Sequence, residues 1–401
     1  MAPPLGTTTD MTHATALRDR FLGEDPRFRR FVLLLAVATA LPMIGVPLTR
    51  GIYRDATAML SLAGLMSFLG GPGHVALTTW FFADPVARDH FRVHPLRYLW
   101  VPLALIVGTT AAYAVWQERE PTRWINLFFS CWLLWHYQKQ NWGVHSFVSR
   151  VASGESASKL EEWILKIAVI GGTTGAIHSA NFGAGTAFEA HSTTAFQAGM
   201  AITALLPVLI VVAITTVPSL RTSPLRLCTL LVTSCFFLPV FIFADPGNAV
   251  LTYGLAHGLQ YLVFMSYVAG ATANGEEAAI SPAAVAAATR GTSPLGGVAT
   301  ATRAASSPVA STPHATTTPN PTAARPGIVT LVVSLLGVGF FLTVCGDVTL
   351  VRQWNLLPLF GLSMGITMAH FVVDAGIWRL RDEFPRRYVG AAFPFLSARP
   401  R

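Results

Sequence analysis

Apolar runs of about 20 residues recur along the chain, and this feature constrains the fold most. Each is long enough to cross a hydrocarbon layer of roughly 30 Å, where a helix satisfies its own backbone polar groups. The runs predict transmembrane helices near residues 31–49, 57–82, 98–116, 122–148, 161–179, 194–217, 225–244, 248–269, 328–345 and 355–379. The predicted fold class is therefore all-α, a polytopic membrane helix bundle of about ten transmembrane helices.

The distribution of basic residues predicts the orientation of the bundle. Most of the 28 lysines and arginines fall in the two ends and in the loops after every second predicted helix. By the positive-inside rule, both termini are cytoplasmic. The net charge of +8 then reflects topology, and because the basic residues form no single patch we expect no nucleic-acid partner. We expect a multi-pass protein of a bacterial inner (plasma) membrane.

Composition divides the chain into five parts. Residues 1–30 are polar and predict a flexible cytoplasmic N-terminus, and 31–269 predict a membrane bundle of about eight helices. Residues 270–326 are rich in Ala, Thr, Ser and Pro and predict a disordered cytoplasmic linker, because they bury too little apolar surface to offset their ordering cost. The last two transmembrane helices occupy 327–380, and 381–401 form a basic cytoplasmic tail.

A histidine and an aspartate stand in the last apolar run. His370 and Asp374 are four residues apart, so they share one face of a helix. Ionisable residues at membrane depth normally face the bundle interior and have a partner, a cavity or a metal. This pair is therefore a candidate site.

The fourth predicted helix has the densest polar content. His136 and Gln140 lie one turn apart, with Lys139 beside them. His145 lies out of phase with His136, and shares their site only if the helix bends near Gly143. So many polar residues exceed what interhelical hydrogen bonding requires, and we interpret them as functional.

Two more histidines lie in apolar runs. His74 follows the sequence Gly-Gly-Pro-Gly, which breaks a helix and either lines a cavity or packs closely against a neighbour. His257 precedes Gln260 and Tyr261, which can orient its ring. In the predicted topology the four histidines and Asp374 lie roughly 8–18 Å from the inner ends of their helices, so they share one layer.

These residues predict a metal site with the ligands His74, His136, His257, His370 and Asp374, to which His145 can be added to make room for a second metal. Imidazoles with one carboxylate suit iron, zinc or copper. His90 and His94, at H-x-x-x-H spacing in a predicted loop, either add a second metal or form part of an amphipathic stretch on the headgroups. Tyr261, Gln140 and Lys139 are the expected catalytic residues, which orient ligands or supply protons.

An apolar chamber within lipid suits the oxidation of an apolar substrate by dioxygen. We expect non-haem iron, with a lipid or another apolar small molecule as substrate, membrane lipids as surroundings and an electron donor as partner. In broad pattern, the histidines at inner helix ends and the single H-x-x-x-H at His90 and His94 resemble the integral-membrane histidine-motif non-haem iron oxygenases. This resemblance, to fatty-acid desaturases and hydroxylases or to membrane carotenoid oxygenases, implies a metal-dependent membrane oxidoreductase of lipid metabolism.

Two other classes of function remain open. Intramembrane histidines on facing helices also ligate haem in electron-transfer proteins. Histidine, aspartate and lysine together with a broken helix also occur in proton-coupled transporters. Zinc and haem therefore remain alternatives to iron.

Overall fold

A computed structural model describes residues 25–52, 65, 68–117, 119–177, 189–243, 246–273 and 326–396. The regular elements within these ranges are all helices, so the prediction of an all-α fold is confirmed. Most of the predicted linker, residues 274–325, lies outside the described residues, as does most of the predicted N-terminal segment.

The helices of the first half are α2 (Pro26–Ile52), η1 (Leu69–Gly73), α4 (His74–Leu77), α5 (Thr79–Ala83), α6 (Pro85–Val93), η2 (Leu96–Trp100), α7 (Val101–Trp116), α8 (Glu120–Ser153) and α9 (Lys159–Ala176). The middle of the chain forms η3 (Glu189–His191), α11 (Ser192–Thr203), α12 (Leu206–Thr216), α13 (Pro218–Thr222), α14 (Pro224–Ser234), α15 (Pro239–Ile242) and α16 (Pro246–Ala273). The last part forms α18 (Ile328–Val333), η5 (Ser334–Val338), α19 (Gly339–Gly346), α20 (Val348–Gln353), α21 (Leu357–Ile377), α22 (Glu383–Tyr388), η6 (Gly390–Ala392) and η7 (Pro394–Leu396).

Five helical stretches in the described ranges are long and apolar enough to cross a membrane. They are Pro26–Val46, Leu96–Trp116, Glu189–Thr216, Ile328–Gly346 and Leu357–Ile377. Helices α8 and α16 are longer than most of these, but they carry the polar residues of the candidate site and fall outside this set. The total of ten membrane crossings and the cytoplasmic location of both ends stay predictions.

Large apolar side chains remain exposed along several of these helices. They include Leu33, Val107, Val208, Val329 and Phe340, each more than half exposed. A water-soluble protein rarely leaves so much apolar surface uncovered. Contact with lipid explains this exposure, as expected for a membrane protein.

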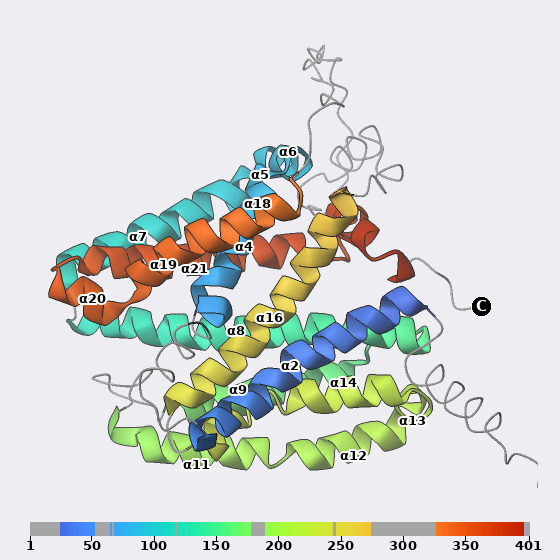
Figure 1. The fold of residues 1–401 in the computed structure, drawn as a ribbon. Helices are drawn as coiled ribbons and strands as arrows, with labels where there is room; N and C mark the ends of the chain where they lie inside the picture. Colours follow the sequence, from blue (N-terminus) through green and yellow to red (C-terminus); the bar gives the residue numbers. More distant parts are fainter. Residues whose placement is uncertain are drawn as a thin grey trace, which may run out of the picture.

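Helix α8 lies between two groups of helices (Figure 1). On one side α7 and α21 pack along each other beside α19, and on the other α9 packs against α11 and α14. Helices α2 and α16 run side by side at a tilt to α8 and contact each other along their length. Helices α4, α8, α16 and α21 all contribute to one buried region, because α16 and α21 each contact both α4 and α8.

The predicted break in the second apolar run is present. Gly71 has non-helical dihedral angles, with φ −114° and ψ −105°, and Pro72 follows it. At this break η1 crosses α16 with glycines on both sides: a Cβ at Gly70 would overlap the backbone of Gly254 and Leu255, and one at Gly258 would overlap the backbone at Leu69. The glycine contact therefore brings the start of α4 close to α16, as the close-packing interpretation of this motif expected.

The seventh predicted helix is shorter than expected. Helix α14 ends at Ser234, and turns lead to Pro239 at the start of α15. Pro239 has no N–H to continue a helical hydrogen-bond ladder, and the adjacent Phe237 packs against Gly172 of α9. Local packing thus replaces a continuous helix with two short ones.

The basic C-terminal segment packs against the bundle as far as the structure describes it. Phe393 and Phe395 are 1% and 3% exposed, and their rings lie 5.3 and 5.7 Å from the ring of Phe147 in α8. Both also contact Phe31 of α2. The aromatic residues thus hold the neighbouring arginines near the end of α8.

Candidate metal site

Five ionisable side chains from four helices meet in the buried region beside α8. His74 comes from α4, His136 from α8, His257 from α16, and His370 and Asp374 from α21. We call these five residues the histidine cluster. His74, His257, His370 and Asp374 are each at most 5% exposed, and His136 is partly buried.

The imidazole rings of the cluster contact one another directly. Nε2 of His257 lies 3.2 Å from Nε2 of His74. The ring centroid of His370 lies 5.0 Å from that of His74 and 5.2 Å from that of His136. The His136 ring also lies 5.1 Å from His257 and stacks on Phe371. Helices far apart in the sequence thus place these rings around one point.

Two overlapping sets of residues have the geometry of a metal site. His74, His257 and His370 form one set, and His136, His370 and Asp374 form the other; within each set the ligand atoms lie within 4.8 Å of one another. Four buried ring nitrogens have no hydrogen-bond partner: Nδ1 of His74, Nε2 of His136, Nδ1 of His257 and Nε2 of His370. Buried polar atoms normally have a partner, so these nitrogens fit a bound cation.

Tyr261 and Thr78 hold the carboxylate and one ring in place. The Tyr261 hydroxyl donates to Oδ1 of Asp374 at 2.9 Å, and Thr78 Oγ1 lies 3.1 Å from the same hydroxyl. Thr78 Oγ1 also lies 2.6 Å from Nδ1 of His370, which leaves Nε2 available as a ligand atom. Such contacts fix the orientation of a metal-binding ring. Tyr261 therefore lies at the cluster, but it bonds to Asp374 and not to the His257 ring that the sequence predicted it would orient.

The other two predicted catalytic residues have different positions. Gln140 donates through Nε2 to the backbone oxygen of His257 at 3.1 Å and to Gln260 at 2.8 Å, so it ties α8 to α16. Lys139 lies on the wall of a cavity, with its ammonium 5.6 Å from the ring centroid of Trp135. We assign Gln140 a positioning role and give Lys139 no role at the cluster.

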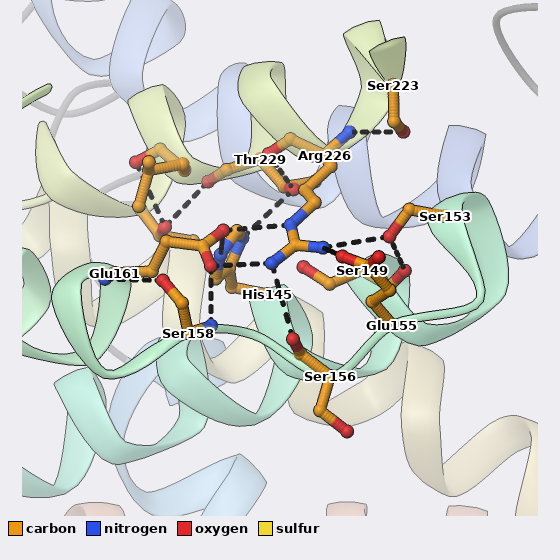
Figure 2. Close-up of polar contacts among 12 residues, drawn as sticks. His145, Ser149, Ser153, Glu155, Ser156, Ser158, Glu161, Ser223, Arg226 and Thr229 are labelled. Atoms are coloured by element: carbon orange, nitrogen blue, oxygen red, sulfur yellow. Dashed lines mark hydrogen bonds and ion pairs between the residues drawn. The ribbon is translucent and has the colours of Figure 1, made fainter. Parts of the chain in front are cut away.

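The structure does not bring His145 to the cluster. Helix α8 continues through Gly143, so His145 stays on another face, where Nε2 lies 3.0 Å from Oε1 of Glu161 and Nδ1 lies 3.2 Å from Thr229. Figure 2 shows His145 with Glu161 and Arg226 in a separate polar network. Both ring nitrogens are engaged there, so His145 is a structural residue.

His90 and His94 lie in and just after α6, and they pack against other residues. The His90 ring stacks on Phe384 at a centroid distance of 3.8 Å and lies 4.6 Å from His94. Phe384 belongs to α22, so this contact attaches the C-terminal segment to α6. Neither histidine belongs to the two metal-ligand sets of the described chain.

The buried His90 ring predicts a measurable pH effect. Burial, with His94 and Arg97 nearby, lowers the pKa of His90 from 6.5 to about 3. Because an unfolded histidine takes up a proton that the buried ring resists, we expect stability to fall as the pH falls from 6.5 towards 3. His90→Phe keeps the ring stacking on Phe384. It should lower the slope of unfolding free energy against pH by up to about 1.4 kcal/mol per pH unit. Denaturant unfolding of the purified protein at several pH values measures the slope of unfolding free energy against pH. A slope in His90→Phe equal to that of wild type would contradict the prediction. His191→Phe, at an exposed position, is the control.

A cavity of about 1290 Å³ runs beside the cluster. His136, Tyr261 and Asp374 lie at its inner end, and Trp132 and Phe371 are part of its wall. Its lining also includes arginines of α8 and of the C-terminal segment, namely Arg150, Arg379, Arg381, Arg386 and Arg387. Of the five cluster residues, His136 and Asp374 line this cavity, so it adjoins the histidine cluster on the side of α8 and α21.

Sequence reasoning did not single out Thr78, Phe371 or these arginines. Thr78 follows His74 by four residues and so shares its helix face, a spacing that was visible in the sequence. The stacking of Phe371 on His136 depends on how α21 packs against α8, which no local pattern encodes. Of the remaining histidines, His191 is exposed in η3, and His178 lies outside the described residues.

No protein-family model, curated protein or solved structure matches this chain. The resemblance to histidine-motif oxygenases stays a prediction.

Proposed function

We propose that the histidine cluster binds a metal ion, with iron preferred, and that the protein is a membrane-embedded oxygenase, hydroxylase or desaturase acting on a lipid or another apolar substrate. Its setting is a bacterial inner membrane, with about ten crossings and both ends in the cytoplasm. One observation carries the proposal: ring nitrogens without partners and a carboxylate converge from four helices, beside a cavity that His136 and Asp374 line.

The ligand set supports a transition metal. Calcium and magnesium prefer oxygen ligands, whereas imidazole nitrogens with one carboxylate suit iron, copper and zinc. When bound, iron would supply the activation of dioxygen. The protein's own contribution is to orient the ligands: Thr78 holds the His370 ring, and Tyr261 holds the Asp374 carboxylate.

The aromatic wall of the cavity suits an apolar substrate. Trp132 and Phe371 pack with ring centroids 5.5 Å apart, and Phe371 in turn covers His136. In a hydroxylation, one oxygen atom enters a C–H bond and the other leaves as water, which requires two electrons and two protons from an external donor. In a desaturation, the substrate loses two hydrogens and both oxygen atoms leave as water, with the same external requirement.

Metal content and product mass together test the proposal. We expect elemental analysis of the detergent-purified full chain to find iron bound to the protein. With a membrane lipid extract, an electron donor and isotope-labelled dioxygen, we expect a lipid product that has gained an oxygen atom or lost two hydrogens. Chelation of the metal should remove this product.

Two outcomes would contradict the proposal. Protein without a transition metal, after expression in iron-supplemented medium, would exclude a metal site of this kind. A Soret band in the visible spectrum would assign the histidines to haem instead.

A further inference from the structure

The charges that line the cavity have an uneven distribution. Its inner end contains the buried pair Tyr261 and Asp374, which bond to each other. Its exposed part is lined by cations: Arg381 has a side chain that is 71% exposed, and Arg150, Arg386 and Lys139 are also exposed. Asp374 is the one acidic residue among the described lining residues. The cavity mouth therefore favours an anion.

Two of these arginines have no acidic partner in the described chain. Arg387 pairs with Glu383, and Arg379 and Arg381 both lie near Asp382. In the described ranges, no carboxylate lies within ion-pair distance of Arg150 or Arg386. Their guanidinium groups can form charge-assisted hydrogen bonds with a carboxylate ligand.

The wall between the mouth and the cluster is largely aromatic. Trp142, Phe147 and Phe264 line it, together with Trp378 at the end of α21. A volume of about 1290 Å³ exceeds the roughly 300–1,000 Å³ of pockets for drug-sized ligands. An apolar ligand larger than a drug molecule fits this space.

Two residues of α8 that line the cavity are separated by about the length of one lipid molecule. The rise along α8 from His136 to Arg150 is about 21 Å, at about 1.5 Å per residue. Half of a bilayer that is roughly 40–45 Å thick, headgroups included, is about 20–22 Å. A single-chain amphiphile held by its anionic head at Arg150 would therefore extend its tail to the histidine cluster.

We propose that the cavity binds a long-chain fatty acid, with its carboxylate at Arg150 and Arg386 and the methyl-end half of its chain at the histidine cluster. This inference rests on the proposed function, and it specifies the substrate class and which end of the substrate reaches the metal. It places the reacting carbon far from the carboxylate.

Binding of oleate and of oleyl alcohol to the full chain in detergent tests the recognition of charge. We expect oleate to bind at least about tenfold more tightly than the alcohol, because hydrogen bonds between charged groups are stronger than those to a neutral hydroxyl. R150Q combined with R386Q should weaken oleate binding about tenfold and leave alcohol binding within about twofold. R221Q removes the same kind of exposed charge from α13, away from the cavity, and should change neither affinity.

Brominated fatty acids test the orientation of the chain. Trp132 lies one turn before His136, at the inner end of the cavity. Its fluorescence is obtained as the difference between wild type and Trp132→Phe. We expect quenching by bromines near the methyl end, reversed by excess oleate, and much weaker quenching by bromines beside the carboxylate.

These outcomes separate the inference from the proposed function. Equal affinities for oleate and the alcohol, or an unchanged oleate affinity in the double variant, would overturn the inference even if the protein binds iron. Stronger quenching by the carboxylate-end label would overturn the proposed orientation. Charge-selective oleate binding by protein without a metal would support the inference and contradict the proposed function.

Discussion

Replacing His370 with alanine is expected to remove essentially all bound metal from the purified protein. His370 belongs to both ligand sets, and its Nε2 has no hydrogen-bond partner. The substitution therefore takes one ligand from every metal arrangement that the cluster allows. His136→Ala leaves only two members of the second set but keeps all three members of the first, so we expect it to lower the metal content less than His370→Ala does. Elemental analysis of the variants, expressed in parallel with wild type, measures the effect.

His191→Ala is the matched control, because His191 is exposed in η3 and remote in sequence from every cluster residue. It should retain the metal content of wild type. Thr78→Val removes the hydrogen-bond contacts to Nδ1 of His370 and to the Tyr261 hydroxyl but no metal ligand, and should weaken metal affinity by about 10–100-fold without abolishing binding. Equal metal in the His370, His136 and His191 variants would show that the cluster is not the metal site. Thermal unfolding of each variant without metal shows whether its fold is intact.

Arg226→Met is expected to destabilise the protein by about 3–5 kcal/mol, because it leaves the Glu161 carboxylate buried without its cation. The Arg226 guanidinium donates through Nη2 and Nε to the two Glu161 oxygens, at 2.6 and 2.9 Å (Figure 2). The arginine is 1% exposed and the glutamate is fully buried. Nη1 of the same arginine also donates to Ser153, so the network joins α8, α9 and α14. Denaturant unfolding in detergent measures the loss.

Lys159→Met is the control for this substitution. Lys159 pairs with Glu162 at 3.0 Å, but its side chain is 90% exposed, so the pair contributes at most about 1 kcal/mol. The double variant Arg226→Met with Glu161→Leu removes both charges, and should recover much of the stability that the single variant loses. A single variant as stable as wild type would contradict a structural role for the network.

The sequence predicted much of the fold because a membrane imposes simple requirements. A run such as 355–379 is long and apolar enough to cross, and α21 was found at Leu357–Ile377. The prediction was weaker where polar residues interrupt the pattern. The run at 225–244 was expected to form one helix, but Pro239 and the packing of Phe237 on Gly172 divide it into two.

The candidate site could be predicted only in part. The spacing of His370 and Asp374 placed them on one helix face, and their location in an apolar run indicated a buried site. The same reasoning included His145, which depended on a bend that α8 does not have. It also missed Thr78, although the spacing of four residues from His74 was visible in the sequence. It missed the cavity arginines because these acquire their positions from helices that are distant in sequence.

The sequence by itself determined the helical, membrane-spanning class of this protein and the residue types available for a site, because hydrophobic length and buried ionisable groups are local properties. Only the tertiary structure decided which imidazoles meet. The contact between Gly70 and Gly258 brings α4 against α16, and that approach sets the 3.2 Å separation of His74 and His257. Such a contact depends on two helices that lie far apart in the chain, and the spacing of residues within either helix does not encode it.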